Sequence, residues 1–248
     1  MPLREDIEKE GNWLFRWRSY LPLLGIPILF IALRNTKLIE RFFGDSTGDL
    51  WESCSIVVSF FGLIVRCITV GYVPRGTSGR NTKWQVAESL NTAGVYAVVR
   101  NPLYLGNFLI VFGVALFIQV WWFALVMWIG FWLYYERIIF AEEEFLRRKF
   151  VDQFVDWAKK TPAIIPRLRN WQKPDLPFSV KTVIRREFST YFSIVASFFF
   201  LEIVTNLLTQ KRFYVHSSWV IFFSVNLVIY LILRIIKKKT KILNVPGR

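Results

Sequence analysis

Long apolar runs separated by short charged stretches dominate the pattern of hydrophobic and polar positions in this chain of 248 residues. A helix needs roughly 20 apolar residues to cross ~30 Å of hydrocarbon. Several runs reach about that length, so the pattern predicts an all-α integral membrane protein with about six transmembrane helices. The predicted spans are residues 19–34, 51–73, 102–119, 120–141, 189–208 and 216–236.

The third and fourth spans follow one another almost directly, which predicts a helical hairpin inside the membrane. Trp121 and Trp122 mark its outer turn, since aromatic side chains favour the membrane interface. Beyond the fourth span, the apolar residues between Phe145 and Trp157 keep helical spacing. This spacing predicts that the helix leaves the membrane as an amphipathic cytoplasmic arm, which ends within residues 161–168.

The chain therefore divides into three predicted regions. Residues 1–73 form an interfacial helix, over about 3–18, and two transmembrane helices. Residues 74–168 form the hairpin, its entry loop and the arm. Residues 169–248 form a basic linker, two further transmembrane helices and a basic tail.

The formal net charge of +14 would favour nucleic acid as the partner of a soluble chain. In a membrane protein, Lys and Arg gather instead on the cytoplasmic side. The predicted inner segments hold 25 Lys or Arg, and the predicted outer segments hold 4. The inner segments are 1–18, 74–102, 142–188 and 234–248. This asymmetry predicts both termini in the cytoplasm and no nucleic-acid partner.

The densest candidate signal lies at residues 94–106, in the inner loop that enters the third span. Asn101 is a good N-cap, and Pro102 suits the first helical position, where a missing N–H is harmless. Arg100 then stands just outside a helix N-terminus, whose free N–H groups favour anions. Alternatively, Asn-Pro is only a helix start and Tyr104 only an interfacial aromatic residue.

A second signal is the run Glu142, Glu143 and Glu144 at the inner end of the fourth span. One or two of these carboxylates are suited to bind hydroxyl or ammonium groups of a polar cofactor. The alternative is an ion-paired surface with the basic residues 147–149, since charge runs usually face water. Both interpretations place the run at the cytoplasmic surface.

Two charged residues fall within predicted spans, Arg66 in the second and Glu136 in the fourth. An Arg at the bilayer centre costs ~2.5–3.5 kcal/mol on insertion scales, so it should face protein or water. Arg66 is expected to snorkel or to pair with Glu136, or else to contact substrate. Gly106, in the third span, permits close approach of a ligand or a neighbouring helix.

Together, the ordered signals over about 94–168 resemble the isoprenylcysteine carboxyl methyltransferase and phospholipid methyltransferase family. Its members carry Arg-His-Pro-x-Tyr-x-Gly at a helix start, then a helical hairpin, Glu-Glu-x-x-Leu, an aromatic arm and a Pro-Arg-Leu-like ending. Asn101 stands here in place of the usual His but can still form hydrogen bonds. Val151 and Phe154 stand in place of the Gly and Tyr often found in the arm.

The resemblance implies S-adenosylmethionine as methyl donor, bound on the cytoplasmic side, and a lipid-linked acceptor that enters from the bilayer. By this analogy, the candidate cofactor-binding residues are Tyr96, Asn101, Pro102, Tyr104, Gly106, Glu142 and Glu143. The candidate catalytic residues are Arg100 and Arg167, and the candidate substrate contacts are Arg66 and Glu136.

Residues 11–20, 79–82 and 90–92 further resemble a bacterial branch of this family, which is linked to O-methylation of the 1-phosphate of lipid A. That branch implies the bacterial inner membrane. The sole histidine, His216, lies at the predicted outer end of the sixth span. It cannot act at the inner site or join a metal cluster there, so no metal is expected.

A phosphate or carboxylate acceptor is already ionised at neutral pH, whereas an ammonium headgroup must first lose a proton. Without a histidine near the site, the sequence favours an anionic oxygen acceptor held by Arg100, with Arg167 or Arg66. Carboxyl methylation of isoprenylcysteine and N-methylation of a phospholipid amine are alternatives. A non-catalytic lipid-binding scaffold and a sterol reductase are competing classes, although sterol reductases are usually longer chains.

Overall fold

The described residues of the computed structural model are 2–18, 20–74, 76–77, 85–210 and 215–248. Residues 79–82, part of the resemblance to the bacterial branch, lie outside them. The described chain is helical, as the apolar pattern predicts. In chain order its helices are α1 (Leu3–Trp17), η1 (Leu21–Gly25), α2 (Ile26–Leu33), α3 (Leu38–Phe43), α4 (Asp45–Tyr72), α5 (Val95–Val98), α6 (Pro102–Phe117), α7 (Trp121–Lys160), η2 (Leu168–Asn170), α8 (Val180–Gln210) and α9 (Ser217–Lys239).

Four helices of the described chain are long and apolar enough to cross a membrane, namely α4, α7, α8 and α9. They correspond to the second, fourth, fifth and sixth predicted spans. The third predicted span forms α6, a shorter apolar helix of 16 residues. The prediction of an all-α membrane protein is therefore confirmed.

The first predicted span, 19–34, does not form one continuous helix. Its described part consists of the 3₁₀ helix η1 and the 8-residue helix α2. Pro27 lies in the first turn of α2, and a proline cannot donate the backbone hydrogen bond that would continue the preceding helix. At 1.5 Å per residue, α2 reaches only about 12 Å. It packs against α7 and α8 instead of forming a full span.

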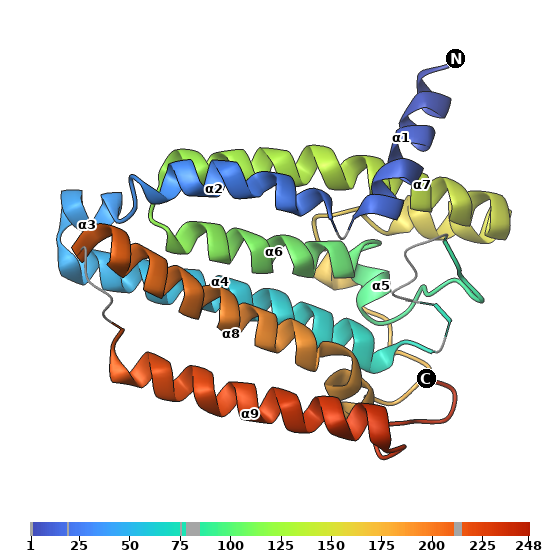
Figure 1. Cartoon of the computed structure of the whole chain (residues 1–248). Coiled ribbons are helices and arrows are strands. Elements are labelled where there is room, and N and C mark those ends of the chain that lie inside the picture. Colours follow the sequence, from blue (N-terminus) through green and yellow to red (C-terminus); the bar gives the residue numbers. More distant parts are fainter. Residues whose placement is uncertain (1, 19, 75, 78–84, 211–214) are drawn as a thin grey trace.

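The long helices lie side by side (Figure 1), with α4 packed between α6 and α8 and with α9 against α8. At one end of this bundle lie α1, α5 and the tail that follows α9. At the opposite end lie α3 and the turn from α6 into α7. We call these the α5 end and the α3 end.

The apolar core lies toward the α3 end, where α2, α4, α6, α7 and α8 bury their side chains together. The ring centroids of Phe117 in α6 and Phe198 in α8 are 5.0 Å apart. Gln119, in the tight turn between α6 and α7, is buried with φ +62°. Its side-chain oxygen accepts from the Glu40 amide over 2.9 Å. Packing and hydrogen bonds thus fix this end of the hairpin.

Helices α4 and α6 approach closely at glycines. A Cβ on Gly62 would lie 2.6 Å from the Gly106 carbonyl oxygen, and one on Gly106 would lie 2.5 Å from Arg66 Cγ. Small residues allow such close backbone approach between membrane helices. Of the two expectations for Gly106, the structure places it against a neighbouring helix.

Helix α7 has 40 residues, about twice the length that a membrane requires. Its first half follows the fourth predicted span, and its second half is the predicted arm. Val151 interrupts the helix with φ +37° and ψ −109°. The arm therefore begins as a direct continuation of the span and changes direction at Val151.

Helix α1 crosses α7 at the α5 end (Figure 1). A Cβ on Gly11 would lie 2.1 Å from the Arg137 carbonyl oxygen, so the two backbones nearly touch. Three ion pairs join the helices: Arg4 with Glu144, Glu8 with Arg148, and Glu10 with Arg137. The packing and the ion pairs hold α1 over the middle of α7, from Arg137 to Arg148.

Candidate functional site

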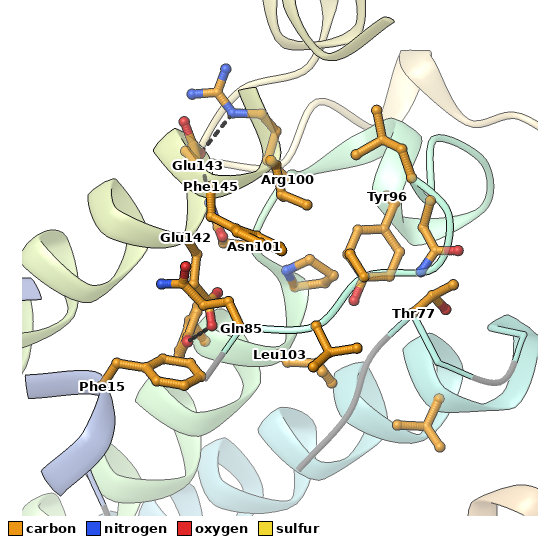
Figure 2. Close-up of a pocket in the computed structure, with 18 of the residues that line it drawn as sticks. Phe15, Thr77, Gln85, Tyr96, Arg100, Asn101, Leu103, Glu142, Glu143 and Phe145 are labelled. Carbon is orange, nitrogen blue, oxygen red and sulfur yellow. Dashed lines mark hydrogen bonds and ion pairs between the residues drawn. The ribbon is translucent and has the colours of Figure 1, made fainter. Parts of the chain in front are cut away.

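A cavity of about 300 Å³ opens at the α5 end. Its walls come from α1, α4, α5, α6, α7 and α8, together with residues 85–87 and 89–91 of the loop before α5. Figure 2 shows the side chains that point into it. The three predicted regions of the chain all contribute, so the pocket is a product of the whole fold.

Tyr104 links the start of α6 to α7. Its hydroxyl donates to Glu142 Oε1 over 2.8 Å. The Arg18 guanidinium of the segment after α1 lies 3.9 Å from the same carboxylate. Glu142 is thus shared between a hydroxyl donor and a cation at the pocket wall.

Asn101 occupies the N-cap position of α6, as predicted, but its side chain does not cap the helix. Its Nδ2 instead donates to Glu143 Oε1 over 3.1 Å and to the Ala163 carbonyl over 3.2 Å. A cap requires an acceptor oxygen aimed at the first turn. Here the amide is turned toward a carboxylate, which offers a charged partner.

Arg100 also binds Glu143, with 3.0 Å between Nε and Oε1. Its Nη1 donates to the Ala158 carbonyl over 2.9 Å. In Figure 2 the guanidinium lies beside Glu143, at the edge of the pocket. Arg100 therefore holds a pocket carboxylate and the arm of α7 together.

Backbone hydrogen bonds tie the segment before α6 to the segment after α7. The Arg100 amide donates to the Pro162 carbonyl over 2.9 Å, and the Arg167 amide donates to the Val98 carbonyl over 3.0 Å. Trp157 Nε1 donates to the Tyr96 carbonyl over 3.0 Å. These bonds fix α5 so that the Tyr96 ring points into the pocket (Figure 2).

Arg66 pairs with Glu187 of α8 and not with Glu136, one of the partners expected from the sequence. Both Arg66–Glu187 contacts, from Nε and Nη2, measure 2.9 Å. Its Nη1 donates to Asn107 Oδ1 over 2.6 Å. Glu136 is exposed, while Tyr135 faces the pocket. Adjacent helical residues point about 100° apart, which accounts for the difference.

The structure brings together most of the predicted site residues. Those that line the pocket are Arg66, Tyr96, Arg100, Asn101, Pro102, Tyr104, Glu142 and Glu143. Three others do not line it. Gly106 packs against α4, Glu136 lies on another face of α7, and the exposed Arg167 contributes its backbone amide to the contact with α5.

Several pocket residues escaped prediction from the sequence. Phe15 and Arg18 come from the α1 segment, and Arg186 comes from α8. Phe15 and Arg18 fall within residues 11–20, which resemble the bacterial branch but suggest no chemical role, and Arg186 falls within the predicted basic linker. Asn107 had a usable signal, since a polar residue inside an apolar span often faces the protein interior.

The third carboxylate of the acidic run has a different environment. Glu144 is buried against α1, where it pairs with Arg4 and lies 3.9 Å from Arg147. The ion-paired alternative therefore describes Glu144, whereas Glu142 and Glu143 face the pocket. One face of α7 therefore uses an acidic residue to attach α1, and another face directs two carboxylates into the pocket.

Among the described residues, no group of three His, Cys, Asp or Glu is arranged to hold a metal ion. His216 stands at the start of α9, where its side chain accepts from the Ser218 amide over 3.4 Å. This position is at the α3 end, opposite the pocket. The pocket's own chemistry rests on carboxylates, guanidinium groups, tyrosines and amides.

Burial raises the pKa of the Tyr96 hydroxyl, and the positive charge of Arg186 opposes that shift. Tyr96 therefore stays protonated at neutral pH and is available as a hydrogen-bond donor. Arg186 lines the same pocket as Tyr96. The pocket thus presents the carboxylates of α7 together with several guanidinium groups.

The fold and the site define an all-α integral membrane protein with a polar pocket at one end of its helix bundle. Residues 76–153 match the family model described as phospholipid methyltransferase. The matched segment contains the start of α6 and the first half of α7, including both pocket carboxylates. The family resemblance predicted from the sequence is therefore confirmed over this segment.

Two curated relatives match about half of the chain. One is the nickel-cobalt-cadmium resistance protein NccN of Alcaligenes xylosoxydans xylosoxydans, 30% identical over 54% of this chain and 61% of its own length. The other is the cobalt-zinc-cadmium resistance protein CzcN of Cupriavidus metallidurans, 32% identical over 53% of this chain and 59% of its own length. The matched part thus spans about three-fifths of each relative. No solved structure matches the chain.

Proposed function

We propose that this protein is an S-adenosylmethionine-dependent methyltransferase that acts on an anionic, lipid-linked acceptor at the cytoplasmic membrane face. The observation that carries the proposal is the pairing of Tyr104 with Glu142, and of Asn101 and Arg100 with Glu143, in one pocket. All five residues lie in the segment that matches phospholipid methyltransferases.

The pocket residues fit S-adenosylmethionine in chemistry and in size. The ammonium, sulfonium and ribose hydroxyl groups of this molecule are suitable partners for the carboxylates Glu142 and Glu143. The aromatic rings of Tyr135 and Trp157 offer surfaces on which adenine can pack. A cavity of about 300 Å³ lies at the lower end of the usual range for small-molecule sites.

The protein's contribution to methyl transfer is mainly positioning, which supplies ~7–11 kcal/mol at best. Bound S-adenosylmethionine supplies the activated methyl group. An ionised acceptor oxygen forms the new O–C bond as the donor's S–C bond breaks, the oxygen loses its negative charge, and no proton has to move. In this arrangement Glu142 and Glu143 orient the donor, and Arg66 orients the acceptor.

Among acceptors we favour a lipid phosphate, such as the 1-phosphate of lipid A. Carboxyl methylation of isoprenylcysteine fits the same charge, whereas N-methylation of a phospholipid amine requires a base for the ammonium proton. His216, at the α3 end, cannot serve as that base. Residues 90–92, part of the resemblance to the bacterial branch, include the pocket-lining Asn91.

We also propose that the α5 end faces the cytoplasm of a bacterial inner membrane. Helix α1, α5 and the tail after α9 belong to the basic segments that the positive-inside rule places inside. The α3 end carries the segments that are poor in Lys and Arg. The donor would then enter the pocket from water, and the acceptor from the inner leaflet.

The names of the two relatives concern resistance to divalent metal cations. Methylating a phosphate monoester removes part of its charge of about −1.5 to −2 at neutral pH. We propose that a membrane modified in this way binds fewer divalent cations at its surface. Vesicles made from the lipids of cells that express the wild type should bind less cadmium than vesicles from cells that express the Glu143→Gln variant. Equal cadmium binding would contradict the proposed connection between methylation and metal resistance.

Lipid mass spectrometry tests the proposed reaction. Expression in a Gram-negative host should produce a lipid heavier by ~14 mass units, since one methyl replaces one hydrogen in this reaction class. The Glu143→Gln variant should lack that lipid. An unchanged lipid profile together with methylation of a prenylcysteine analogue would select the carboxyl acceptor.

Calorimetry separates the enzyme from a non-catalytic scaffold. The purified protein in detergent should bind S-adenosylmethionine, and the Glu142→Gln variant should bind it more weakly. A scaffold would give no heat with millimolar S-adenosylmethionine and no methyl incorporation into an organic lipid extract. That combination would overturn the proposal.

A further inference from the structure

Helix α8 lies outside the segment that matches phospholipid methyltransferases, yet it reaches the pocket. Arg186, in the second turn of α8, is half-buried and lines the cavity. The family match ends at residue 153, so it gives no role to this side chain. The position of Arg186 therefore needs its own explanation.

Contacts on both sides of Arg186 hold the start of α8 firmly against α4. The neighbouring Glu187 forms the two-point ion pair with Arg66. At the junction before α8, a Cβ on Gly71 would lie 2.1 Å from the Phe178 ring, and the Ser179 amide donates to the Gly71 carbonyl over 3.0 Å. Arg186 consequently projects from a rigid element, which suits a residue that recognises a ligand.

The pocket carboxylates already have basic partners, Arg18 at Glu142 and Arg100 at Glu143. Glu142 and Glu143 lie together on α7, and Tyr96 lies across the pocket from them in Figure 2. Arg66 of α4 and Arg186 of α8 also line the pocket, and Arg66 pairs with Glu187 rather than with Glu142 or Glu143. A cationic donor suits the carboxylates of α7, and an anionic acceptor suits the guanidinium groups that α4 and α8 contribute.

Arg66 is already engaged by protein partners and would hold an anion with its remaining donors only. Its charge is balanced by Glu187, whose side chain is only 4% exposed. Three of its nitrogens already donate to Glu187 and Asn107. Arg66 keeps N–H groups for directional bonds, because a guanidinium carries five, and the guanidinium of a second pocket-lining arginine, Arg186, adds further donors.

We propose that Arg186 of α8, together with Arg66 of α4, forms an acceptor subsite for the anionic phosphate headgroup of a lipid. This inference rests on the proposed methyltransferase function and assigns part of the acceptor site to the C-terminal helices. Helices α4 and α8 both belong to the membrane-spanning set. The headgroup would lie at their α5 end while its acyl chains stay in the bilayer.

Binding of short-chain lipids to the purified full-length protein in detergent tests this subsite without turnover. Calorimetry compares dioctanoyl phosphatidic acid, dioctanoyl phosphatidylcholine and inorganic phosphate. The wild type should prefer phosphatidic acid to phosphatidylcholine by about tenfold, the effect of one charge-assisted hydrogen bond. The Arg186→Ala variant should lose most of that preference, and Arg186→Lys should keep part of it.

Arg185→Ala is the matched control, since it removes the same charge from the adjacent, half-buried residue that does not line the pocket. It should keep the headgroup preference within about twofold. Equal losses in the two alanine variants would overturn the proposal, because they would indicate a diffuse basic surface. Binding of inorganic phosphate as tight as that of the lipid would also overturn it.

Binding of S-adenosylmethionine to the same variants separates this inference from the proposed function. Arg186→Ala should bind the donor as the wild type does, which also verifies that the variant folds. Suppose that neither the wild type nor the variants bind S-adenosylmethionine, but the headgroup preference still depends on Arg186. The methyltransferase proposal then fails and the anion subsite stands. If donor binding is normal but the headgroup preference does not depend on Arg186, the anion subsite fails and the donor site stands.

Discussion

The Tyr104 hydroxyl of α6 donates to Glu142 of α7 over 2.8 Å, in the part of the pocket that we propose binds S-adenosylmethionine. Replacing Tyr104 with Phe removes this hydrogen-bond donor and leaves the half-buried carboxylate of Glu142 with one partner fewer. Hydrogen bonds to charged groups contribute ~1.5–3 kcal/mol. We therefore expect Tyr104→Phe to weaken S-adenosylmethionine binding at least about tenfold, measured by calorimetry.

Tyr134→Phe is the control for this substitution. Tyr134 does not line the pocket, and its hydroxyl makes no hydrogen bond within the described residues. This variant should bind the donor as the wild type does. Equal affinities of Tyr104→Phe and the wild type would show that the hydroxyl does not organise the site.

Val151 has a backbone conformation that its side chain disfavours. Its φ of +37° is an outlier for a β-branched residue, and glycine adopts such angles without a Cβ penalty. The family that the sequence resembles is expected to carry Gly at this place in the arm. Because local strain of this kind costs ~1–3 kcal/mol, Val151→Gly should raise the thermal unfolding temperature by several degrees.

Val151→Ala distinguishes relief of strain from loss of the side chain. Alanine keeps the Cβ, so this variant should gain little or nothing in unfolding temperature. If Val151→Gly is instead destabilised, as glycine is in an ordinary helix, then the arm does not bend at Val151 in solution.

For single residues, the sequence predicted the kinds of side chain in the site better than the directions in which those side chains point. Tyr104, Glu142 and Glu143 were found because their spacing matched a known motif. Glu136 was predicted to contact substrate, but its neighbour Tyr135 faces the pocket instead. Until the packing of a helix is known, the sequence does not determine which of two adjacent residues faces a site. Glu187, the partner of Arg66, lies 121 positions further along the chain, and no local pattern connects the two.

Among the helices, the α4–α6 contact sets the position of Arg66. Gly106→Ala would place a methyl group 2.5 Å from Arg66 Cγ and 2.9 Å from the Gly62 carbonyl oxygen. Overpacking costs ~1–3 kcal/mol. We expect Gly106→Ala to lower the unfolding temperature in detergent by ~2–4 °C per kcal/mol lost.

Gly130→Ala, in α7, is the matched control, since a Cβ there meets nothing within 4 Å. Alanine stabilises a helix relative to glycine by ~1 kcal/mol. This variant should therefore unfold at the same or a higher temperature. If both variants behave alike, α4 and α6 are not in close contact at Gly106.

The attachment of α1 to α7 can be tested by exchanging charges. Glu8→Arg places like charges at the Glu8–Arg148 pair. Because an exposed pair contributes ~0–1 kcal/mol, hydrogen exchange in α1 should rise severalfold, and more at low salt. The double variant Glu8→Arg with Arg148→Glu should restore slow exchange; faster exchange in both variants would mean that these charges do not hold α1.

The hairpin of α6 and α7 and the continuous arm followed from apolar length and spacing. The first predicted span failed as a single helix because a hydropathy window does not register the break before α2. The position of α1 across α7 also escaped prediction, since its partners on α7 are more than 120 residues away.

For the whole molecule, the pocket is assembled from segments that the sequence separates widely. Phe15 and Arg18 come from the first region, the paired carboxylates from the second, and Arg186 from the third. The sequence could identify the middle region because its motif is local. It could not assign the C-terminal helices a role, since their contribution depends on the packing of α8 against α4.

Methyl transfer by the purified protein tests the central claim most directly. The protein is placed in lipid nanodiscs that contain anionic lipid, with S-adenosylmethionine labelled in its methyl group, and label is counted in the organic extract. We predict label in the lipid fraction with the wild type and none with Glu143→Gln. Absence of label with a wild type that binds the donor, across phosphate, carboxylate and amine acceptors, would contradict the account.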